Sequence, residues 1–272
     1  MHYSTRQMTT VAVALVAFIA ACVAHEVVGH GGACLVEGGD VTLLSTVYFR
    51  CQGGGVVADL GGPLANLVLG VACLTLLRGQ RWSRDAKRLL VLGFAFNFLW
   101  LAGCMLWSSI AGQSDFAYAV HLLGPAEPAM RVVVGFLGLV LARSTVRVVA
   151  RQGLSRTTLR VSYVTAGVAS GVSVLFFVGP VLPALWEAAL EGFGAMAWLL
   201  FVPNAGAAVK PDAVQSAGES LPAWLAISSV TAMSVFLLLG RGYQLPQTAK
   251  SSIERAASSR LGPPSTALHL NR

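Results

Sequence analysis

The sequence predicts an all-α polytopic membrane protein of about six transmembrane helices, with a small β-hairpin between the first two. Three observations predict this class. The 272 residues are 55% hydrophobic and only 11% charged, whereas soluble domains carry roughly a quarter of charged residues. Six apolar segments are long enough to cross a bilayer. The basic residues, which give a net charge of +7, lie mainly in short loops between these segments.

The expected spans cover residues 8–30, 56–78, 88–111, 129–150, 161–185 and 221–240. A further apolar piece, GFGAMAWLLFVP at residues 192–203, is too short to cross and is expected to be re-entrant or interfacial. The motifs described below lie in residues 1–128, the expected core. Residues 129–240 are expected to add transmembrane helices, and residues 241–272 form a basic tail whose composition favours disorder.

Lysine and arginine predict the orientation of the chain. They crowd the loop at 78–88, the loop around 143–160 and the tail after 240, whereas the alternate loops are nearly free of them. With six spans, these three regions and the N-terminus lie on one side. The positive-inside rule assigns that side to the cytoplasm, so both termini are expected there. Richness in Ala, Gly, Val and Arg is typical of bacteria, which favours a bacterial cytoplasmic membrane.

The N-terminus has a second interpretation. Arg6, the apolar stretch after it and the sequence IAAC at residues 19–22 resemble a signal peptide with a lipoprotein-type cysteine. Cleavage there would remove the first span and leave His25 close to a free terminus. The remaining loop charges fit both interpretations, and the uncleaved span is favoured because apolar helices produce such matches easily.

Ionisable residues inside spans are costly and are therefore functional candidates. In this sequence they fall at one level of the membrane, at the end of the first span, the start of the second and the end of the third: His25, Glu26, His30, Asp59 and Asp115. The orientation was assigned without these residues. Their common depth therefore independently indicates a site on the outer side.

The sequence HEVVGH at residues 25–30 has one residue more than the helical zinc motif His-Glu-x-x-His. On a regular helix, positions i and i+5 lie about 140° apart, so His25 and His30 would face different directions. A one-residue π-bulge would bring them together, and Gly29 eases that distortion. HEVVGH resembles the His-Glu-x-x-Gly-His motif of the dipeptidyl-peptidase III family, which binds zinc. The alternative is that both histidines simply end a helix at the interface.

A second motif widens the resemblance. DLGGPLANLVLG, at residues 59–70, contains a Gly-Pro-x-x-Asn element. It resembles the element that follows the His-Glu motif in site-2-protease-like intramembrane zinc metalloproteases. This resemblance implies that Gly62, Pro63 and Asn66 bind the substrate, because the Asn66 amide and the backbone groups freed by Pro63 need partners in a membrane. The alternative is a kinked, glycine-rich packing helix.

The same resemblance implies zinc-dependent peptide hydrolysis. The family's third zinc ligand is an Asp near a later core helix, commonly in a Leu-Asp-Gly context that this sequence lacks. Asp115 is the best match by order along the chain, and Asp59 is the rival. His25, His30 and Asp115 would hold Zn²⁺, and Glu26 would be the general base. The implied substrate is a transmembrane or juxtamembrane segment of a membrane protein in the lipid bilayer.

The segment GGACLVEGGDVTLLSTVYFRCQGG joins the first two spans. Its Val, Thr, Tyr and Phe residues after a Gly-Gly-Asp turn predict a β-hairpin. Cys34 and Cys51 flank the hairpin on the predicted outer side, where a disulfide could persist, although the sequence leaves their pairing open. The resembling family often carries a small sheet here, thought to bind the substrate as an added strand.

The resemblance covers roughly residues 8–120. Those proteases usually hold the zinc toward the cytosol, whereas the loop charges here place the site outside. Two other functions stay open: a zinc-dependent membrane lipid hydrolase, and a non-catalytic binding protein or ion-binding transporter. No nucleic-acid partner is expected, because no aromatic residues are interleaved with the basic ones. The sequence does not assign an oligomeric state.

Overall fold

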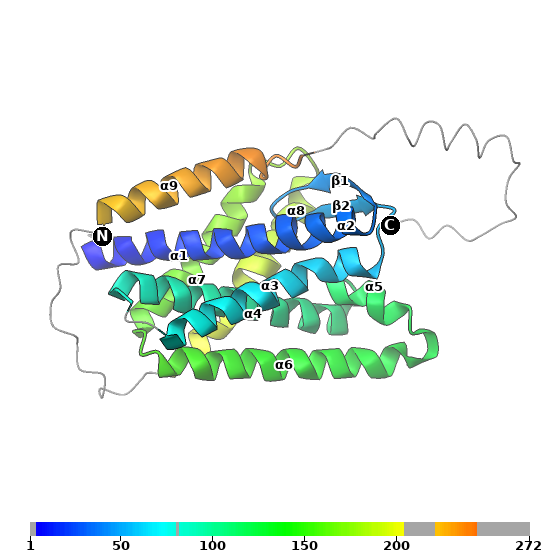
Figure 1. The fold of residues 1–272 in the computed structure, drawn as a ribbon, viewed down its shortest axis with the longest axis horizontal. Helices are drawn as coiled ribbons and strands as arrows, with labels where there is room; N and C mark the ends of the chain where they lie inside the picture. Colours follow the sequence, from blue (N-terminus) through cyan, green and yellow to red (C-terminus); the bar gives the residue numbers. More distant parts are fainter. Residues whose placement is uncertain (1–3, 80–81, 204–220, 244–272) are drawn as a thin grey trace, which may run out of the picture.

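The described part of the chain is a bundle of long helices with a small sheet at one end (Figure 1). The computed structural model describes residues 4–79, 82–203 and 221–243. The architecture is that of an α-helical polytopic membrane protein with one two-stranded sheet, in agreement with the predicted class. Within the described ranges, six helical segments are long and apolar enough to cross a bilayer: Thr5–Val36, Val56–Arg78, Arg84–Ala111, Gly124–Arg151, Val181–Phe201 and Leu221–Leu238.

The helices and strands follow one another with short connections. The first half of the chain contains α1 (Thr5–Val23), the π-helix η1 (Ala24–Gly31), α2 (Gly32–Val36), β1 (Asp40–Leu44), β2 (Phe49–Gln52), α3 (Val56–Gly79), α4 (Arg84–Ala111) and α5 (Asp115–His121). The second half contains the 3₁₀ turn η2 (Gly124–Ala126), α6 (Glu127–Arg151), α7 (Arg156–Val174), α8 (Val181–Ala189), the π-helix η3 (Leu190–Gly194), the 3₁₀-helix η4 (Ala195–Phe201) and α9 (Leu221–Leu238).

The predicted π-type distortion of the first span is confirmed, and it is longer than one bulge. α1 passes into η1 and then α2 without a break, so Thr5–Val36 is one continuous helical segment. Residues 24–31 of this segment have π-helical hydrogen bonding. Because a π-helix joins residue i to residue i+5, it places His30 over His25.

Aromatic side chains of α1 and α4 pack at the centre of the bundle and extend to the site. Phe18 stacks on Trp100 at a ring-centroid distance of 5.5 Å and meets Phe96 edge-on at 5.8 Å. Phe96 and Trp100 are almost completely buried. Trp100 also stacks on His25, with ring centroids 5.2 Å apart. The packed core therefore holds one face of the His25 ring.

Glycines let α3 pack closely against η1. A Cβ atom at Gly29 would meet the backbone of Gly61 and Gly62, and one at Gly61 would meet the Gly29 carbonyl. Small residues serve close helix approach in membranes. The two helices therefore contact backbone to backbone, which brings the start of α3 against the histidines.

The hairpin is the predicted one, with an irregularity between Val41 and Leu43. A disulfide joins Cys34 of α2 to Cys51 of β2 and so ties the hairpin to the helix that carries the histidines. The Glu37 carboxylate accepts hydrogen bonds from the N–H groups of Gly55, Val57 and Ala58, at 2.7, 3.2 and 2.9 Å.

Glu37 thereby caps the first turn of α3. Its hydrogen bonds, first that from Gly55, lower the pKa of the Glu37 carboxyl. A carboxylate at this position satisfies N–H groups that have no partner inside the helix, and it lies at the positive end of the helix dipole. The start of α3 is thus fixed from outside the bundle.

The predicted fifth span, residues 161–185, is wrong at its end. α7 stops at Val174, and the chain turns before Pro180, which is the N-cap of α8. The residue before a proline disfavours helix, so Gly179–Pro180 was a break signal inside the expected span. The piece at 192–203, expected to be re-entrant, is largely part of the continuous segment Val181–Phe201.

The first and last described helices do not follow the expectation that both termini lie on one side, although the termini themselves lie outside the described residues. α7 is not among the six apolar segments, but it makes an additional passage through the bundle, and its buried residues include Ser162 and Ser170. α9 runs in the same direction as α1 (Figure 1). The chain therefore leaves α9 at the hairpin end, where the backbones of Leu44 and Tyr243 exchange hydrogen bonds of 3.0 and 2.7 Å. The tail after Tyr243 lies outside the described residues.

The glycine contact gives a first prediction. Gly29→Ala should lower the free energy of unfolding by about 1–3 kcal/mol, because the added methyl group must push α3 away from η1. Gly32→Ala is the matched control, since a Cβ atom there meets nothing within 4 Å. Unfolding in mixed micelles with increasing dodecyl sulfate would measure both. Equal stability of the two variants would contradict the close packing of α3 on η1.

Candidate metal centre

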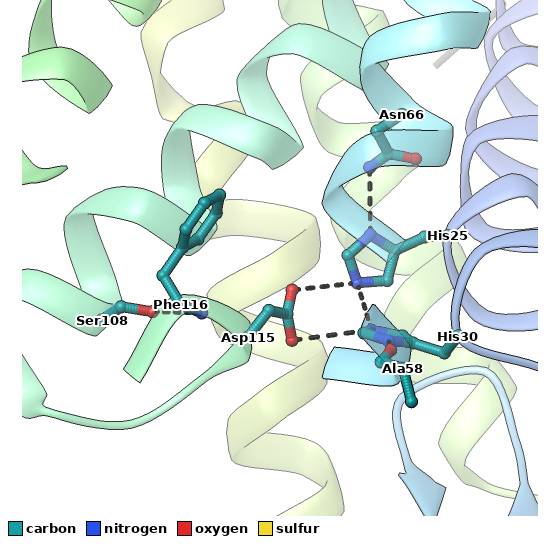
Figure 2. A network of polar contacts seen from close by, with 7 residues as sticks. All are labelled: His25, His30, Ala58, Asn66, Ser108, Asp115 and Phe116. Atoms are coloured by element: carbon teal, nitrogen blue, oxygen red, sulfur yellow. Dashed lines mark hydrogen bonds and ion pairs between the residues drawn. The ribbon is translucent and has the colours of Figure 1, made fainter. Parts of the chain in front are cut away.

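The two histidines of the motif face one another. His25 Nε2 and His30 Nε2 are 3.2 Å apart, and their rings meet edge to face with centroids 4.7 Å apart (Figure 2). Both side chains are buried, at 3% and 5% exposure. The π-helix of η1 produces this meeting, since a regular helix would turn the two rings about 140° apart.

Asp115 approaches the histidines from the start of α5. Its Oδ2 lies 3.3 Å from His25 Nε2, and its Oδ1 lies 3.6 Å from His30 Nε2 (Figure 2). The preceding residue, Ser114, has φ 79° and ψ 178°, a region populated almost only by glycine. The Phe116 N–H donates a 3.2 Å hydrogen bond to Ser108 Oγ of α4. The strained Ser114 and the hydrogen bond of Phe116 thus hold the Asp115 carboxylate toward the two histidines.

The charge state of Asp115 suits a cation. Burial raises the pKa of this carboxyl, but when no metal is bound, hydrogen bonds from protonated His25 and His30 and the positive charges of these rings outweigh burial and hold the Asp115 pKa well below its usual value. The side chain keeps 17% exposure and is the most accessible of the three groups. Asp115 is therefore a carboxylate at neutral pH.

Hydrogen bonds on the far side of each ring set the histidine tautomers. His30 Nδ1 lies 2.7 Å from the Ala58 carbonyl oxygen. A carbonyl can only accept, so Nδ1 carries the proton and Nε2 of the neutral ring has a free lone pair. The Asn66 amide lies 3.2 Å from His25 Nδ1, and Asn66 Oδ1 has no hydrogen-bond partner. A half-turn of this amide lets Oδ1 accept from Nδ1–H, which frees the Nε2 lone pair of His25 as well.

The three groups fit a tetrahedral metal site. His25, His30 and Asp115 each offer one atom, and these atoms lie within 4.8 Å of one another. Metal–ligand bonds of about 2.0–2.1 Å, as for zinc, give a tetrahedron with edges of about 3.3 Å. The two Nε2 atoms are 3.2 Å apart and His25 Nε2 lies 3.3 Å from Asp115 Oδ2, both close to that edge, while His30 Nε2 lies 3.6 Å from the other carboxylate oxygen, Oδ1. Two nitrogens and one carboxylate leave the fourth position for water or substrate, as in catalytic sites.

A cavity of about 420 Å³ opens beside these groups. Glu26 lines it at 3% exposure, and its Oε2 has no hydrogen-bond partner. Asp59, the rival third ligand, also lines the cavity but does not belong to the group of three converging donors. Among the described residues, Asp115 and not Asp59 therefore completes the group of converging donors with His25 and His30.

The residues expected to hold the substrate lie elsewhere. Gly62, Pro63 and Asn66 are buried and do not line the cavity. A Cβ atom at Gly62 would meet the ring nitrogens of His25 and His30, so this glycine makes room for the rings. Asn66 is completely buried and contacts His25. Gly62 and Asn66 therefore adjoin the candidate metal ligands, Gly62 at the Nε2 atoms and Asn66 at Nδ1 of His25.

Several cavity residues were missed by the sequence reasoning. Three tryptophans and two glutamates line the cavity in addition to the motif residues: Trp100, Trp107, Trp198, Glu187 and Glu191. The glutamates come from the segment Val181–Phe201, whose passage through the bundle was not expected. Two glutamates four residues apart in an apolar stretch were the available signal. The expected division into a core of residues 1–128 and additional helices therefore does not describe this cavity.

The surroundings of Tyr48 show how close these glutamates lie to the hairpin. Burial, followed by the charges of Glu187 and Glu191, raises the pKa of the Tyr48 hydroxyl. Tyr48 and Phe49 line the same cavity. Phe49 also stacks on His30 with ring centroids 5.1 Å apart. The hairpin thus forms part of the wall around the candidate metal centre.

Comparison of the chain with family models, with curated proteins and with solved structures gave no match. The interpretation of the site therefore rests on its own geometry.

The converging donors predict one zinc ion per chain. Zinc measured by mass spectrometry on protein purified without chelators should be about one per chain in the wild type and lost in His30→Ala and Asp115→Ala. Asp59→Asn is the matched control, since Asp59 lies outside the group of three and should retain the metal. Loss of zinc in Asp59→Asn with retention in Asp115→Ala would identify Asp59 as the third ligand.

The contact behind His25 gives a separate prediction. Asn66→Leu should weaken zinc binding about 10–100-fold, the usual effect of removing a hydrogen bond that orients a metal-binding histidine. Asn66→Asp keeps an acceptor at His25 Nδ1 and should retain binding. Asn97→Leu is the control, because Asn97 is equally buried but donates to the Gly93 carbonyl, 2.7 Å away. Competition with a chromophoric chelator would measure each affinity, and equal losses in Asn66→Leu and Asn97→Leu would assign Asn66 a packing role only.

Proposed function

We propose that this protein is a zinc-dependent intramembrane peptidase that cleaves transmembrane or juxtamembrane segments of membrane proteins. One observation carries the proposal: the donor atoms of His25, His30 and Asp115 converge on one point, with the buried carboxylate of Glu26 beside them. Without a bound metal ion, a proton on at least one of the two histidines would be needed to balance the Asp115 carboxylate, and a metal ion would take its place. The site resembles that of hydrolytic zinc enzymes in ligand types, open position and adjacent acid.

The residues divide the chemistry between them. Zinc, when bound, would polarise the scissile carbonyl and lower the pKa of the attacking water. Glu26 accepts the proton of that water and passes it to the leaving amine. Glu26 lines the cavity and its Oε2 has no other hydrogen-bond partner, so this oxygen is free for the transfer. Ala58 and Asn66 hold the histidine rings in position from behind.

The surroundings of the cavity favour a peptide substrate over a lipid. A peptide must be extended to present its amide, and extended chains bind along sheets and hairpins. Tyr48 and Phe49 place the hairpin directly at the cavity. β1 pairs with β2 on one edge and with Tyr243, at Leu44, on the other. Phe49 of β2 stacks on His30, so the second edge of β2 would receive an added substrate strand. A lipid hydrolase would need no strand beside its metal.

Two features support an outward-facing site. The disulfide Cys34–Cys51 lies at the hairpin end of the bundle, and disulfides persist in oxidising compartments. The opposite end carries the basic helix termini around Arg78, Arg84 and Arg151. By the positive-inside rule, that end faces the cytoplasm. The cleaved segments would then be reached from the outer half of the membrane.

The geometry of η1 favours a catalytic site over a non-catalytic binding protein or transporter. A binding protein or transporter derived from a damaged motif would be favoured by a regular helix through residues 25–30, with the two histidine side chains pointing apart. Instead, the π-helix turns both rings to one point, and Glu26 lies next to them. The extra residue in the motif is accommodated by the helix.

The proposal predicts that Glu26→Gln keeps zinc but loses cleavage. Replacing the carboxylate removes the proton acceptor while leaving all three metal ligands, so the rate should fall by about 10²–10⁴-fold. The measurement uses zinc-loaded protein in lipid nanodiscs with a pool of synthetic transmembrane peptides, and mass spectrometry of the fragments. The same samples are analysed for released fatty acids.

The outcomes separate the candidate functions. Peptide fragments formed by the wild type and absent with Glu26→Gln support the peptidase. Fatty-acid release in place of fragments would assign a lipid hydrolase. Zinc-loaded wild type that yields neither product would leave the binding function.

A further inference from the structure

The cavity contains more acidic side chains than the proposed hydrolysis uses. Glu26 and Asp115 serve the water and the metal. Glu187 of α8 and Glu191 of η3 line the same cavity, and Asp59 lies at its edge with them. Among the described residues that line this cavity, there is no lysine or arginine.

Two of these carboxylates each have one oxygen that is inaccessible and has no hydrogen-bond partner. Glu191 Oε2 is inaccessible to solvent and makes no hydrogen bond, and the same is true of Glu26 Oε2. The Glu26 side chain is only 3% exposed and belongs to η1, whereas Glu191 belongs to η3. Glu191 also lies in the second π-helix of the described chain, and such segments occur mostly at functional sites. Buried polar groups normally have partners, so a ligand is expected to supply them.

The charge of the ligand follows from the charges of the cavity. A zinc ion would carry two positive charges, which Asp115 and Glu26 balance. Glu187 and Glu191 then face the cavity without a protein cation. Removing charge from water in a membrane is costly unless the charge is paired. Such carboxyl groups are neutralised either by a proton or by a cation, and a positively charged group on the substrate would displace the proton and pair with them.

A second metal ion fits this wall less well. Within the described residues, the group of His, Asp and Glu donors close enough to hold a metal is His25, His30 and Asp115, and neither glutamate belongs to it. An ammonium or guanidinium group needs only one or two carboxylates. Trp107, Trp198 and Tyr48 also line the cavity, and aromatic rings attract organic cations.

We propose that Glu187 and Glu191 bind an arginine or lysine side chain of the peptide substrate, next to the bond that is cleaved. This inference rests on the proposed peptidase function, because it assigns the neighbouring residue of the same substrate. The basic side chain and the scissile amide share one cavity of about 420 Å³, so they are close in the peptide sequence. Substrates would then be segments with a basic residue at the outer edge of the membrane.

The test compares arginine with citrulline, which has nearly the same shape but no charge. A single arginine is moved along a neutral, apolar fluorogenic peptide, and each peptide is matched with its citrulline form. For the wild-type protein loaded with zinc, kcat/KM should be about 10–100-fold higher for arginine at one or two positions, the range expected for charge-assisted hydrogen bonds. In the double variant Glu187→Gln, Glu191→Gln, the arginine-to-citrulline ratio should fall close to one.

Asp40→Asn is the matched control for the double variant. Asp40 is an exposed carboxylate at the start of β1 and does not line the cavity, so the ratio should stay at the wild-type value. Equal cleavage of arginine and citrulline peptides by the wild type would overturn the proposal, and this comparison needs no variant to fold. The assignment to Glu187 and Glu191 would also be overturned if the double variant kept the wild-type arginine-to-citrulline ratio of kcat/KM.

A binding measurement separates failure of this inference from failure of the proposed function. Fluorescence anisotropy with labelled peptides and zinc-loaded Glu26→Gln protein reports binding without cleavage. If no peptide is cleaved by the wild type, the peptidase proposal fails. Tighter binding of the arginine peptides, lost in the triple variant with Glu187→Gln and Glu191→Gln, would still support the cation site, and equal binding of both peptide forms would overturn it.

Discussion

The site depends on the hydrogen-bond register of one helix. His25 and His30 are five residues apart, and only the i→i+5 pattern of η1 places both Nε2 atoms 3.2 Å from each other. A return to regular α-helix through residues 24–31 would swing one ring away from Asp115. The register is held from both sides, by Trp100 stacked on His25 and by Phe49 stacked on His30. The aromatic core thus holds the His25 ring, and the hairpin holds the His30 ring.

α3 contacts both histidine rings and supports their orientation. Ala58 accepts from His30, Gly62 leaves space for both rings, and Asn66 contacts His25. The three residues are four apart, so they lie along one face of the helix. Glu37 fixes the start of that helix through its first N–H groups. Gly62 and Asn66 of the Gly-Pro-x-x-Asn element thus adjoin the candidate ligands, and none of the element's residues lines the cavity.

The sequence was informative wherever the signal was local. The apolar segments, the hairpin, the π-type distortion and the depth of His25, Glu26, His30 and Asp115 all follow from short stretches read against helix and strand geometry. The arrangement of residues 156–201 was not predictable in this way. α7 is shielded by other helices and can carry serines, while Glu187 and Glu191 interrupt an apolar run, so hydropathy misplaced both segments. The contact of Asn66 with a ring nitrogen depends on how two helices pack, which no local pattern contains.

Departures from regular backbone meet at the same place. η1 and η3 are both π-helical, Ser114 has a conformation that favours glycine, and all three lie at one cavity although they are far apart in sequence. Irregular backbone at membrane depth is tolerated only where protein or a water-filled cavity satisfies it. The Ser114 conformation costs about 1–3 kcal/mol and persists because the surrounding structure holds it. Three such departures around one group of ligands are difficult to explain as packing defects, because packing alone would distribute them over the bundle.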